Sequence, residues 1–254
     1  MEELEVFRSR REREEERRKE RSHHDVRDEV FDRRTLLAIS RLVSRDLLQQ
    51  VDFSISTGKV ANVFRVTSAE GPRALKVYRV GNAVFRSMPP YLLHDLREEV
   101  GSNSFGRLVF AWARREFMAL KKCREADVPV PEPIEWYRNL LLMSFVGKDG
   151  LPFPTLIKSE VKNPEKLCRE LCTIVRKMTR GAELVHGDLS PYNLLYDGRH
   201  LTLIDMGESL PVSHPQAAAL LRRDAANFAH YFGRLGLTIG PDELFAKMGG
   251  DRFA

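Results

Sequence analysis

The stretch Leu184-Val-His-Gly-Asp-Leu-Ser-Pro-Tyr-Asn-Leu-Leu195, followed by Leu203-Ile-Asp-Met-Gly207, decides how this sequence is interpreted. It sets Asp188, Asn193 and Asp205 at a spacing typical of sites that hold a nucleoside triphosphate. In such a site one aspartate meets the acceptor hydroxyl or a water molecule, while the asparagine and the second aspartate hold Mg²⁺ against the phosphates. Mg²⁺ suits this set because it takes a few protein oxygens and keeps its other positions for phosphate and water.

The residues between Asn193 and Asp205 predict how these side chains meet. Leu194–Tyr196 and Leu201–Ile204 read as two short strands, and Asp197-Gly198 between them is a strong turn signal. The resulting hairpin brings Asp205 back beside Asn193. A surface loop with scattered carboxylates is the alternative, and the joint spacing of all three polar residues argues against it.

The segment from Phe53 to Val66 reads as a strand, a tight polar loop and a second strand. Gly58 lets the backbone approach a phosphate, Ser56 and Thr57 supply hydroxyls and amides, and Lys59 adds a positive charge. The segment lacks the upstream glycine and the Lys-Ser/Thr ending of a Walker A loop, and it lacks the three glycines of the kinase loop. Taken alone, it also fits an ordinary hairpin turn.

A lysine and a glutamate lie in apolar surroundings that predict an ion pair. Ala74–Tyr78 is an apolar strand that contains Lys76, and a lysine there is costly unless it is paired. The helix expected from about Leu108 to Glu125 carries Glu116 within its apolar stripe. We therefore expect Lys76 to bind Glu116, with a pairing between Glu116 and an arginine of the same helix as the alternative.

A further apolar strand, Leu140–Phe145, runs into the connector that ends at Gly147. In a two-lobed nucleotide-binding enzyme such a connector is the hinge, and the backbone of Ser144 and Val146 would face adenine. On its own, the segment is no more than a buried strand.

Together, these motifs resemble the RIO family of atypical protein kinases, and within it the first RIO subfamily in its archaeal form. They span about residues 50 to 250 and comprise Ser56-Thr-Gly-Lys-Val-Ala-Asn62, Ala74-Leu-Lys-Val-Tyr78, Trp112-Ala-Arg-Arg-Glu116, Pro129-Val-Pro-Glu-Pro133, Met143-Ser-Phe-Val-Gly147, Leu184 to Asn193, and Ile204-Asp205. One departure is Val60, where the family usually has a glutamate. We expect it to be tolerated, because the loop acts mainly through its backbone and its serine and lysine side chains.

The resemblance implies an α+β, two-lobed protein-kinase-like fold. Its N-lobe would be an antiparallel β-sheet with added N-terminal helices, and its C-lobe would be trimmed and mostly helical, since no Ala-Pro-Glu motif follows Asp205. The expected parts are a charged tail or frayed helix (1–24), N-terminal helices (25–50), the N-lobe (51–145) and the C-lobe (146–254).

The resemblance also implies an activity: a serine/threonine protein kinase and ATPase that uses ATP with Mg²⁺, or with Mn²⁺. Asp188 and Asp205 would be catalytic, and Asp205 would itself accept the phosphoryl group. Asn193 and Asp205 would hold the metal. The implied ATP-binding residues are Ser56, Thr57, Gly58, Lys59, Lys76, Glu116, Ser144 and Val146. The implied partner is a precursor particle of the small ribosomal subunit.

The segment Gly81 to Arg107 is expected to be a loop near the γ-phosphate. Pro89-Pro90 argues against a helix, and Gly101-Ser-Asn-Ser-Phe-Gly106 has the composition of a loop. The resemblance implies a mobile loop here with an autophosphorylated serine, for which the candidates are Ser102, Ser104 and Ser87. A purely structural loop is the alternative.

Composition sets the broad class. The chain has 254 residues, a net charge of +5 and three cysteines, which suit one two-lobed unit in a reducing compartment. We see no signal peptide and no apolar run long enough for a membrane, so we expect a cytoplasmic monomer or weak dimer. The charged stretch from Arg8 to Arg21 reads as a solvated tail, with an RNA-binding arm as the alternative.

Two other functions remain open from the sequence alone. A small-molecule phosphotransferase of the aminoglycoside or choline kinase type shares the His-Gly-Asp pattern, with its later asparagine and aspartate. The loop at Ser56-Thr-Gly-Lys59 argues against it. A nucleotide-binding assembly scaffold without catalysis is the second, and the intact set of Lys76, Asp188, Asn193 and Asp205 argues against that.

Overall fold

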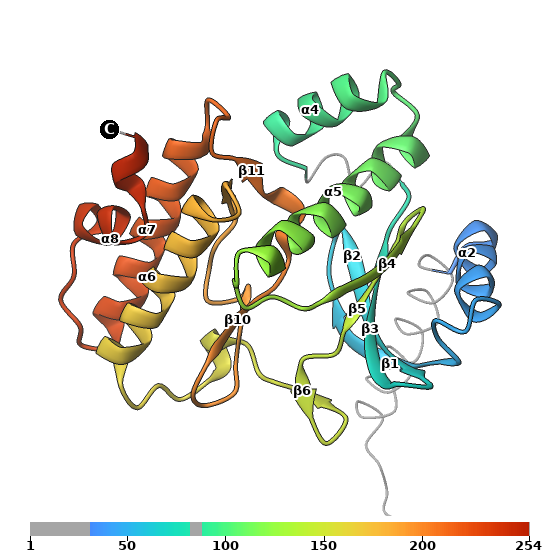
Figure 1. Cartoon of the computed structure of the whole chain (residues 1–254), viewed down its shortest axis with the longest axis horizontal. Helices are drawn as coiled ribbons and strands as arrows, with labels where there is room; N and C mark the ends of the chain where they lie inside the picture. Colours follow the sequence, from blue (N-terminus) through green and yellow to red (C-terminus); the bar gives the residue numbers. More distant parts are fainter. Residues whose placement is uncertain (1–30, 82–87, 254) are drawn as a thin grey trace, which may run out of the picture.

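The computed structural model describes residues 31–81 and 88–253. In this part of the chain the elements form two lobes, with a β-sheet in the N-lobe and a bundle of helices in the C-lobe (Figure 1). The N-lobe elements are α2 (Arg33–Val43), β1 (Gln50–Thr57), β2 (Ala61–Ser68), β3 (Gly71–Tyr78), α4 (Pro90–Val100), α5 (Phe105–Glu125), β4 (Pro133–Tyr137) and β5 (Leu140–Ser144).

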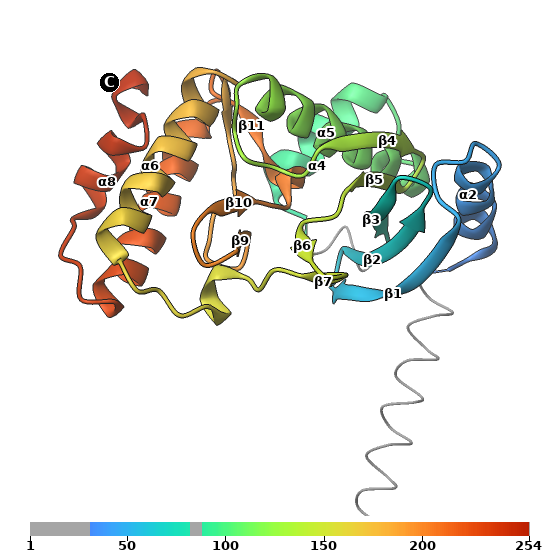
Figure 2. The same ribbon diagram turned by 60° about the horizontal axis from the view of Figure 1, so that its bottom comes forward.

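The second lobe follows a short hairpin, β6 (Gly147–Lys148) with β7 (Leu151–Pro152), and the 3-10 helix η1 (Leu156–Lys158). Its helices lie together at the far side of the molecule from α2, as Figure 2 shows. The remaining elements are α6 (Pro164–Arg180), β8 (Leu184–Val185), β9 (Leu194–Tyr196), β10 (Leu201–Leu203), η2 (Met206–Glu208), β11 (Leu210–Pro211), α7 (Ala217–Arg234), α8 (Pro241–Lys247) and η3 (Gly250–Phe253).

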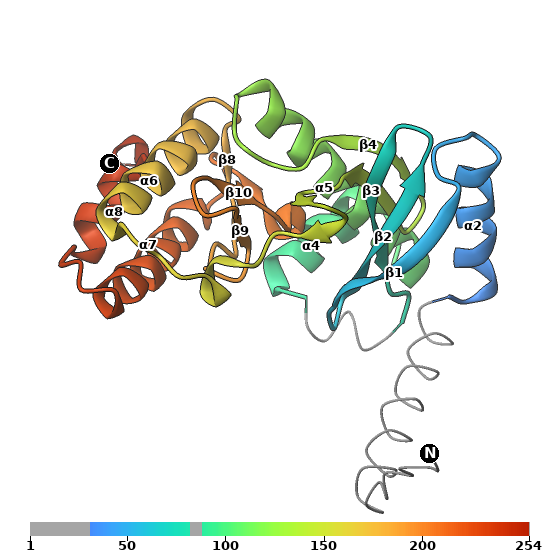
Figure 3. The same ribbon diagram turned by 90° about the horizontal axis from the view of Figure 1, so that it is seen from below.

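The N-lobe sheet is antiparallel, with the strand order β1-β2-β3-β5-β4. Lys76 lies on the central strand β3, opposite Val63 of β2 and Leu141 of β5. Because side chains alternate across a strand, the two faces of β3 have different neighbours. Leu75 and Val77 pack with α2, whereas Lys76 turns to the opposite face, which α5 covers (Figure 3).

The segment from Gly81 to Arg107 is not the continuous loop that its prolines predicted. It contains the helix α4, for which Pro90 is the first residue. Proline is well tolerated there, because the first helical turn has no internal partner for its missing N–H and needs the φ angle that the ring fixes. Gly101 ends α4 in the left-handed conformation, φ +60°, so between Pro90 and Arg107 the loop is confined to the short α4–α5 connection.

Two short antiparallel strand pairs position the polar residues on the C-lobe side. β9 and β10 pair antiparallel, as predicted, and the turn between them is closed by the Asp197 carboxylate, which accepts from the amides of Arg199 (2.7 Å) and His200 (2.6 Å). β8 pairs with β11. The predicted α+β, two-lobed kinase-like fold is confirmed.

Several sequence predictions lie outside the described residues. These are the charged segment 1–24, the first part of the helical segment 25–50, and Ser87. From residue 31 onward that helical segment forms one helix, α2, capped by Asp32, whose carboxylate accepts from the Thr35 amide at 2.7 Å. Within residues 31–81 and 88–253, no helix has both the length and the apolar character needed to cross a lipid bilayer.

Candidate active site

A cavity of about 560 Å³ lies between the two lobes. Its walls come from the β1–β2 loop, β3, α5, the connector after β5, and the segments around β9 and β10. It gathers most of the predicted site: Ser56, Gly58, Lys59, Lys76, Glu116, Ser144, Val146, Asp188, Asn193 and Asp205 all line it. Thr57 does not line it; its hydroxyl lies 3.3 Å from that of Ser54 on the same strand.

The predicted ion pair at the back of the cavity is present. Lys76 Nζ donates to both carboxylate oxygens of Glu116, at 2.9 and 2.8 Å, and both side chains are buried. The Tyr78 hydroxyl, two residues along β3, also donates to Glu116. Tyr78 lies on the same face of β3 as Lys76. Its hydroxyl adds a third hydrogen bond to this buried carboxylate, and no role for it was predicted from the sequence.

Burial and the neighbouring charges shift the pKa values of Lys76 and Glu116 in opposite directions. Burial lowers the pKa of Lys76, but the nearby Asp205 and Glu116 carboxylates outweigh it and raise that pKa overall. Burial raises the pKa of Glu116 to about 7, although the Lys76 charge opposes the rise. Because three N–H or O–H donors converge on the Glu116 carboxylate, we take the pair as ionised at neutral pH.

Asp205 reaches the same lysine from the C-lobe. Its Oδ1 accepts from Lys76 Nζ at 2.6 Å, and 53% of its side chain is exposed, facing the cavity. Burial of the site would raise the pKa of Asp205, but the Lys76 charge and hydrogen bond lower it overall. The Asp205 backbone is left-handed, with φ +63°, a conformation that non-glycine residues adopt mainly where the surrounding structure enforces it.

Asn193 joins the two aspartate segments. Its Nδ2 donates to the Asp188 carbonyl at 2.8 Å and to the Asp188 carboxylate at 3.1 Å, so its Oδ1 is the atom left for a ligand. The Asn193 carbonyl in turn accepts from the Ile204 amide at 3.0 Å. The hairpin therefore holds Asp188, Asn193 and Asp205 on one wall of the cavity, as the sequence predicted.

His186 fixes the segment before Asp188. It is fully buried, and burial lowers the pKa of its imidazole. Its Nε2 lies 3.1 Å from the Ile204 carbonyl, and its Nδ1 accepts from the Asp188 amide at 3.3 Å. These partners assign the proton to Nε2, so a neutral histidine links the Asp188 loop to the strand that leads to Asp205.

A family model described as the RIO domain matches residues 62–244. The RIO-type serine/threonine-protein kinase Rio1 of Haloferax volcanii is 38% identical over 234 residues, which cover 92% of this chain and 80% of that protein.

The chain belongs to the RIO family. By family it is a serine/threonine-protein kinase, and its relatives include archaeal Rio1 of Methanocaldococcus jannaschii, 33% identical over 88% of this chain and 77% of that protein. Human serine/threonine-protein kinase RIO1 is 34% identical over 87% of this chain, but the match spans only 40% of the human protein.

Solved RIO kinases have the same fold. The Rio2 kinase of Chaetomium thermophilum superposes with a TM-score of 0.65 at 23% identity, over 84% of this chain and 66% of that one. Its ADP/Mg²⁺-phosphoaspartate complex gives 0.64 at 22% identity, over 84% and 65%.

In the expected hinge, residues 144–147, two backbone groups hydrogen-bond to other parts of the chain. The Ser144 amide donates to the Glu132 carbonyl at 2.8 Å, and the Val146 carbonyl accepts from the Phe153 amide at 3.2 Å. The Val146 amide has no backbone partner in the described part of the chain. Both residues line the cavity, so the Val146 amide can meet a ligand there.

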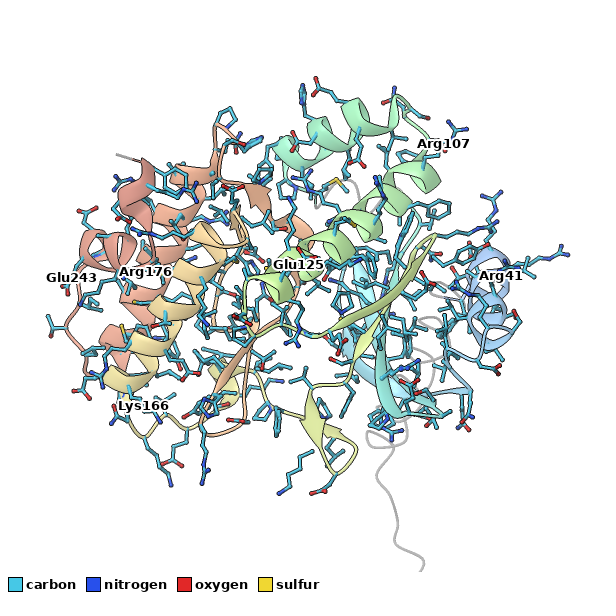
Figure 4. The ribbon with its side chains drawn as sticks, viewed as in Figure 1. Arg41, Arg107, Glu125, Lys166, Arg176 and Glu243 are labelled. Atoms are coloured by element: carbon cyan, nitrogen blue, oxygen red, sulfur yellow. The ribbon has the colours of Figure 1, made fainter. Side chains whose placement is uncertain are left out.

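The candidate serines of this RIO chain lie apart from the cavity. Ser102 and Ser104 are in the α4–α5 connection, and neither lines it. Figure 4 labels Arg107 and Glu125 at opposite ends of α5, and the serines precede the Arg107 end. At a rise of 1.5 Å per residue, Ser104 lies roughly 18 Å along the helix axis from Glu116. The structure thus does not place these two serines beside the expected γ-phosphate.

Two further acidic residues, Glu208 and Asp224, complete the site. Glu208 of η2 lines the cavity, and burial, with the charges of Asp188 and Asp205, raises its pKa to about 7. Asp224 of α7 is fully buried and is bound by the Leu189 amide, and burial raises its pKa to about 7 against the opposing charge of Arg223. For Asp224 the sequence left two roles open, a bond to backbone amides of the catalytic loop or a pairing with Arg222 or Arg223, and the Leu189 contact matches the first. Glu208 had no sequence signal beyond being an acidic residue after a strand.

Proposed function

We propose that the interlobe cavity binds ATP together with Mg²⁺ and transfers its γ-phosphoryl group. The observation that carries this proposal is the double contact of Lys76, which binds Glu116 of the N-lobe and Asp205 of the C-lobe. A charged lysine held in this way is placed to meet phosphate oxygens, and the opposite wall carries Asp188 and Asn193.

In the proposed pose, the nucleotide contacts polar groups that face the cavity. Adenine would meet the backbone of Ser144 and Val146, and the phosphates would run toward Lys76. The β1–β2 loop would cover them with Ser56, Gly58 and Lys59. That loop is tight: a Cβ on Gly58 would lie 3.0 Å from the Ala61 carbonyl, and the Gly58 amide already donates to that oxygen. In this pose Thr57 contributes its backbone only.

The donor set fits Mg²⁺. Asn193 Oδ1 and the Asp205 oxygen that does not face Lys76 are hard oxygen ligands on one wall, few enough to leave the remaining positions to phosphate and water. Mn²⁺ prefers the same ligands. A bound ion would neutralise charge on the phosphates.

In the proposed reaction the Asp205 carboxylate attacks the γ-phosphorus. A new O–P bond forms at Asp205, the bond to the β-phosphate oxygen breaks, and ADP leaves. Asp188 then accepts the proton of a water molecule or a serine hydroxyl that takes the phosphoryl group from Asp205. The ADP/Mg²⁺-phosphoaspartate complex of Chaetomium thermophilum Rio2 is a property of that protein, and we extend it to this chain as part of the proposal.

We further propose a cytoplasmic role in maturation of the small ribosomal subunit, with the protein acting as a monomer or a weak dimer. The net charge of +5 suits contact with RNA. We also propose that the protein autophosphorylates at Ser87, Ser102 or Ser104. For Ser102 and Ser104 it would occur between two molecules, because those residues lie far from the cavity of their own chain.

The test is ATP turnover with Mg²⁺, measured with and without small-subunit precursor particles. The proposal expects turnover that the particles change and that Asp188→Ala and Asp205→Ala each abolish. Turnover that depends on an added amino-alcohol and ignores the particles would instead identify a small-molecule kinase. Tight nucleotide binding without turnover would identify a scaffold.

A further inference from the structure

The helix α4 belongs to the N-lobe by sequence, but its side chains reach the C-lobe. Asp95 accepts from Arg115 of α5 at 3.3 Å, and Arg115 also donates to the Ser209 carbonyl at 3.2 Å. On the other side, Asp95 Oδ1 lies 3.6 Å from Nε2 of His214, in the segment before α7. The three side chains are only 17 to 23% exposed, so this contact between the lobes is largely shielded from water.

Both ring nitrogens of His214 face a neighbouring group. Its Nδ1 accepts from the Gln216 amide at 3.1 Å, which places the ring proton on Nε2, toward Asp95. The His214 ring also packs on the ring of Tyr91, one turn before Asp95 on α4, with 6.0 Å between centroids. Tyr91 is therefore held in place by an aromatic contact and by the anchoring of its own helix.

The Tyr91 hydroxyl ends at the Asp188 loop. It is buried, it has no hydrogen-bond partner among the described residues, and a Cβ on Gly187 would lie 3.3 Å from it. Burial and the charge of Glu208 raise the pKa of this hydroxyl, so it is a neutral donor. A buried hydroxyl without a partner is costly, so its position beside Gly187 calls for an explanation.

Gly187 is enclosed from every side. Its φ is +83°, a Cβ there would overlap the Glu208 carbonyl, and Arg223 of α7 donates to the Gly187 carbonyl. Asp188 is the next residue, so any shift of Gly187 moves the Asp188 carboxylate. Of the groups around Gly187, Tyr91 is the one supplied by the N-lobe.

We propose that Tyr91 is a positioning residue for phosphoryl transfer, which holds the Gly187–Asp188 turn from the N-lobe side and is itself anchored by the Asp95, Arg115 and His214 contacts. The proposal rests on the proposed function, since Tyr91 acts through Asp188. It assigns to α4 the task of coupling the relative position of the lobes to the geometry of the catalytic loop. Nucleotide affinity should depend little on Tyr91, because Tyr91 does not line the cavity.

The test compares Tyr91→Phe and Tyr91→Ala with the intact chain, in steady-state ATP turnover and in equilibrium binding of Mg²⁺ with a non-hydrolysable ATP analogue. Tyr91→Phe removes only the hydroxyl, which lies against Gly187, and is expected to lower kcat about 5-fold because the Gly187–Asp188 turn loses that packing contact. Tyr91→Ala also removes the ring and should lower kcat by roughly 100-fold. In both variants KM and the analogue Kd should stay within about 2-fold of the intact chain.

The matched control is Tyr137→Phe on β4, which removes a hydroxyl far from Asp188 and should leave kcat unchanged. Asp95→Asn should also lower kcat, as Tyr91→Phe does. Unchanged kcat in Tyr91→Phe and Asp95→Asn, or a rise in KM and Kd at constant kcat, would overturn the positioning role. Absence of turnover in the intact chain is a different result, since it would reject the proposed function itself.

Discussion

Lys76 decides the chemistry of the site at the scale of single residues. It is buried, yet it carries its charge because one carboxylate from each lobe faces it. The cost of desolvating a lysine is met only when such partners are present, so Glu116 and Asp205 are required by the same argument that places Lys76 in a strand. Opening the lobes would separate Lys76 from Asp205 while leaving the Glu116 pair intact.

Breaking the buried pair should destabilise the protein. Lys76→Met leaves the Glu116 carboxylate buried with the Tyr78 hydroxyl and the Met206 amide as its remaining donors, and we expect a loss of about 3 kcal/mol in the free energy of unfolding, measured with urea. The double variant Lys76→Met/Glu116→Gln keeps the Tyr78 hydrogen bond without the buried charge, so it should recover at least half of that loss while staying inactive. Equal destabilisation of the single and double variants would show that burial of the charge is not the cause.

Glu208 should make stability depend on pH. Its pKa is raised to about 7 in the folded chain, so the folded state binds more protons than the unfolded state between about pH 4.5 and 7. Stability is therefore full at the acidic end of this window and is lost as pH rises through it. Glu208→Gln should reduce this decline by about 1 kcal/mol in urea titrations without Mg²⁺ or nucleotide. This is less than the full pKa shift would give, because the Glu208 side chain is only partly buried and solvent screens its charge.

Glu116 and Asp224 have raised pKa values as well, so some decline should remain in Glu208→Gln. Glu98→Gln serves as the control, since Glu98 is a largely exposed carboxylate on α4. A decline of the same size in Glu208→Gln and in the intact chain would show that Glu208 is ionised throughout the window.

At the scale of elements, local patterns were predictable and the placement of α4 was not. The β9–β10 hairpin follows from the Asp197-Gly198 turn and the apolar residues on either side, all of which act within a few residues. α4 was missed because Pro89-Pro90 was interpreted as a helix break, although proline at the first helical position is compatible with a helix. Whether a helix forms after such a pair depends on packing, here of Leu92 and Leu96 against α5, which no local pattern reveals.

Two glycines with positive φ should differ sharply in their response to alanine. Gly198 in the hairpin turn has open space around it, so Gly198→Ala should cost about 1 kcal/mol of stability with kcat unchanged. At Gly187 the added Cβ would overlap the Glu208 carbonyl, so Gly187→Ala should lower kcat by roughly 100-fold, because the Asp188 loop must move. Thermal unfolding gives the stability of the two variants, and steady-state turnover gives their kcat. Equal kcat in Gly187→Ala and Gly198→Ala would show that the overlap at Gly187 does not move the Asp188 loop.

At the scale of the whole molecule, the two lobes each supply half of a site. The cavity residues named in the sequence analysis could be predicted because each lies in a short motif with a recognisable physical pattern, such as a lysine in an apolar strand. Tyr78, Tyr91 and Glu208 could not be predicted, because their roles arise where α4, α5 and η2 meet, at positions far apart in the chain. The fold places Lys76 and Asp205 129 residues apart in sequence and 2.6 Å apart in space.

The central claim is that this interlobe cavity transfers the γ-phosphoryl group of ATP through Asp205. The most direct measurement is incubation with Mg²⁺ and γ-labelled ATP, followed by acid quench, treatment of half the sample with hydroxylamine, and peptide mapping. The account predicts a hydroxylamine-sensitive label on the peptide that contains Asp205, formed by the intact chain and absent from Asp205→Asn. ATP consumption at an equal rate by the intact chain and Asp205→Asn, without a sensitive label, would contradict it.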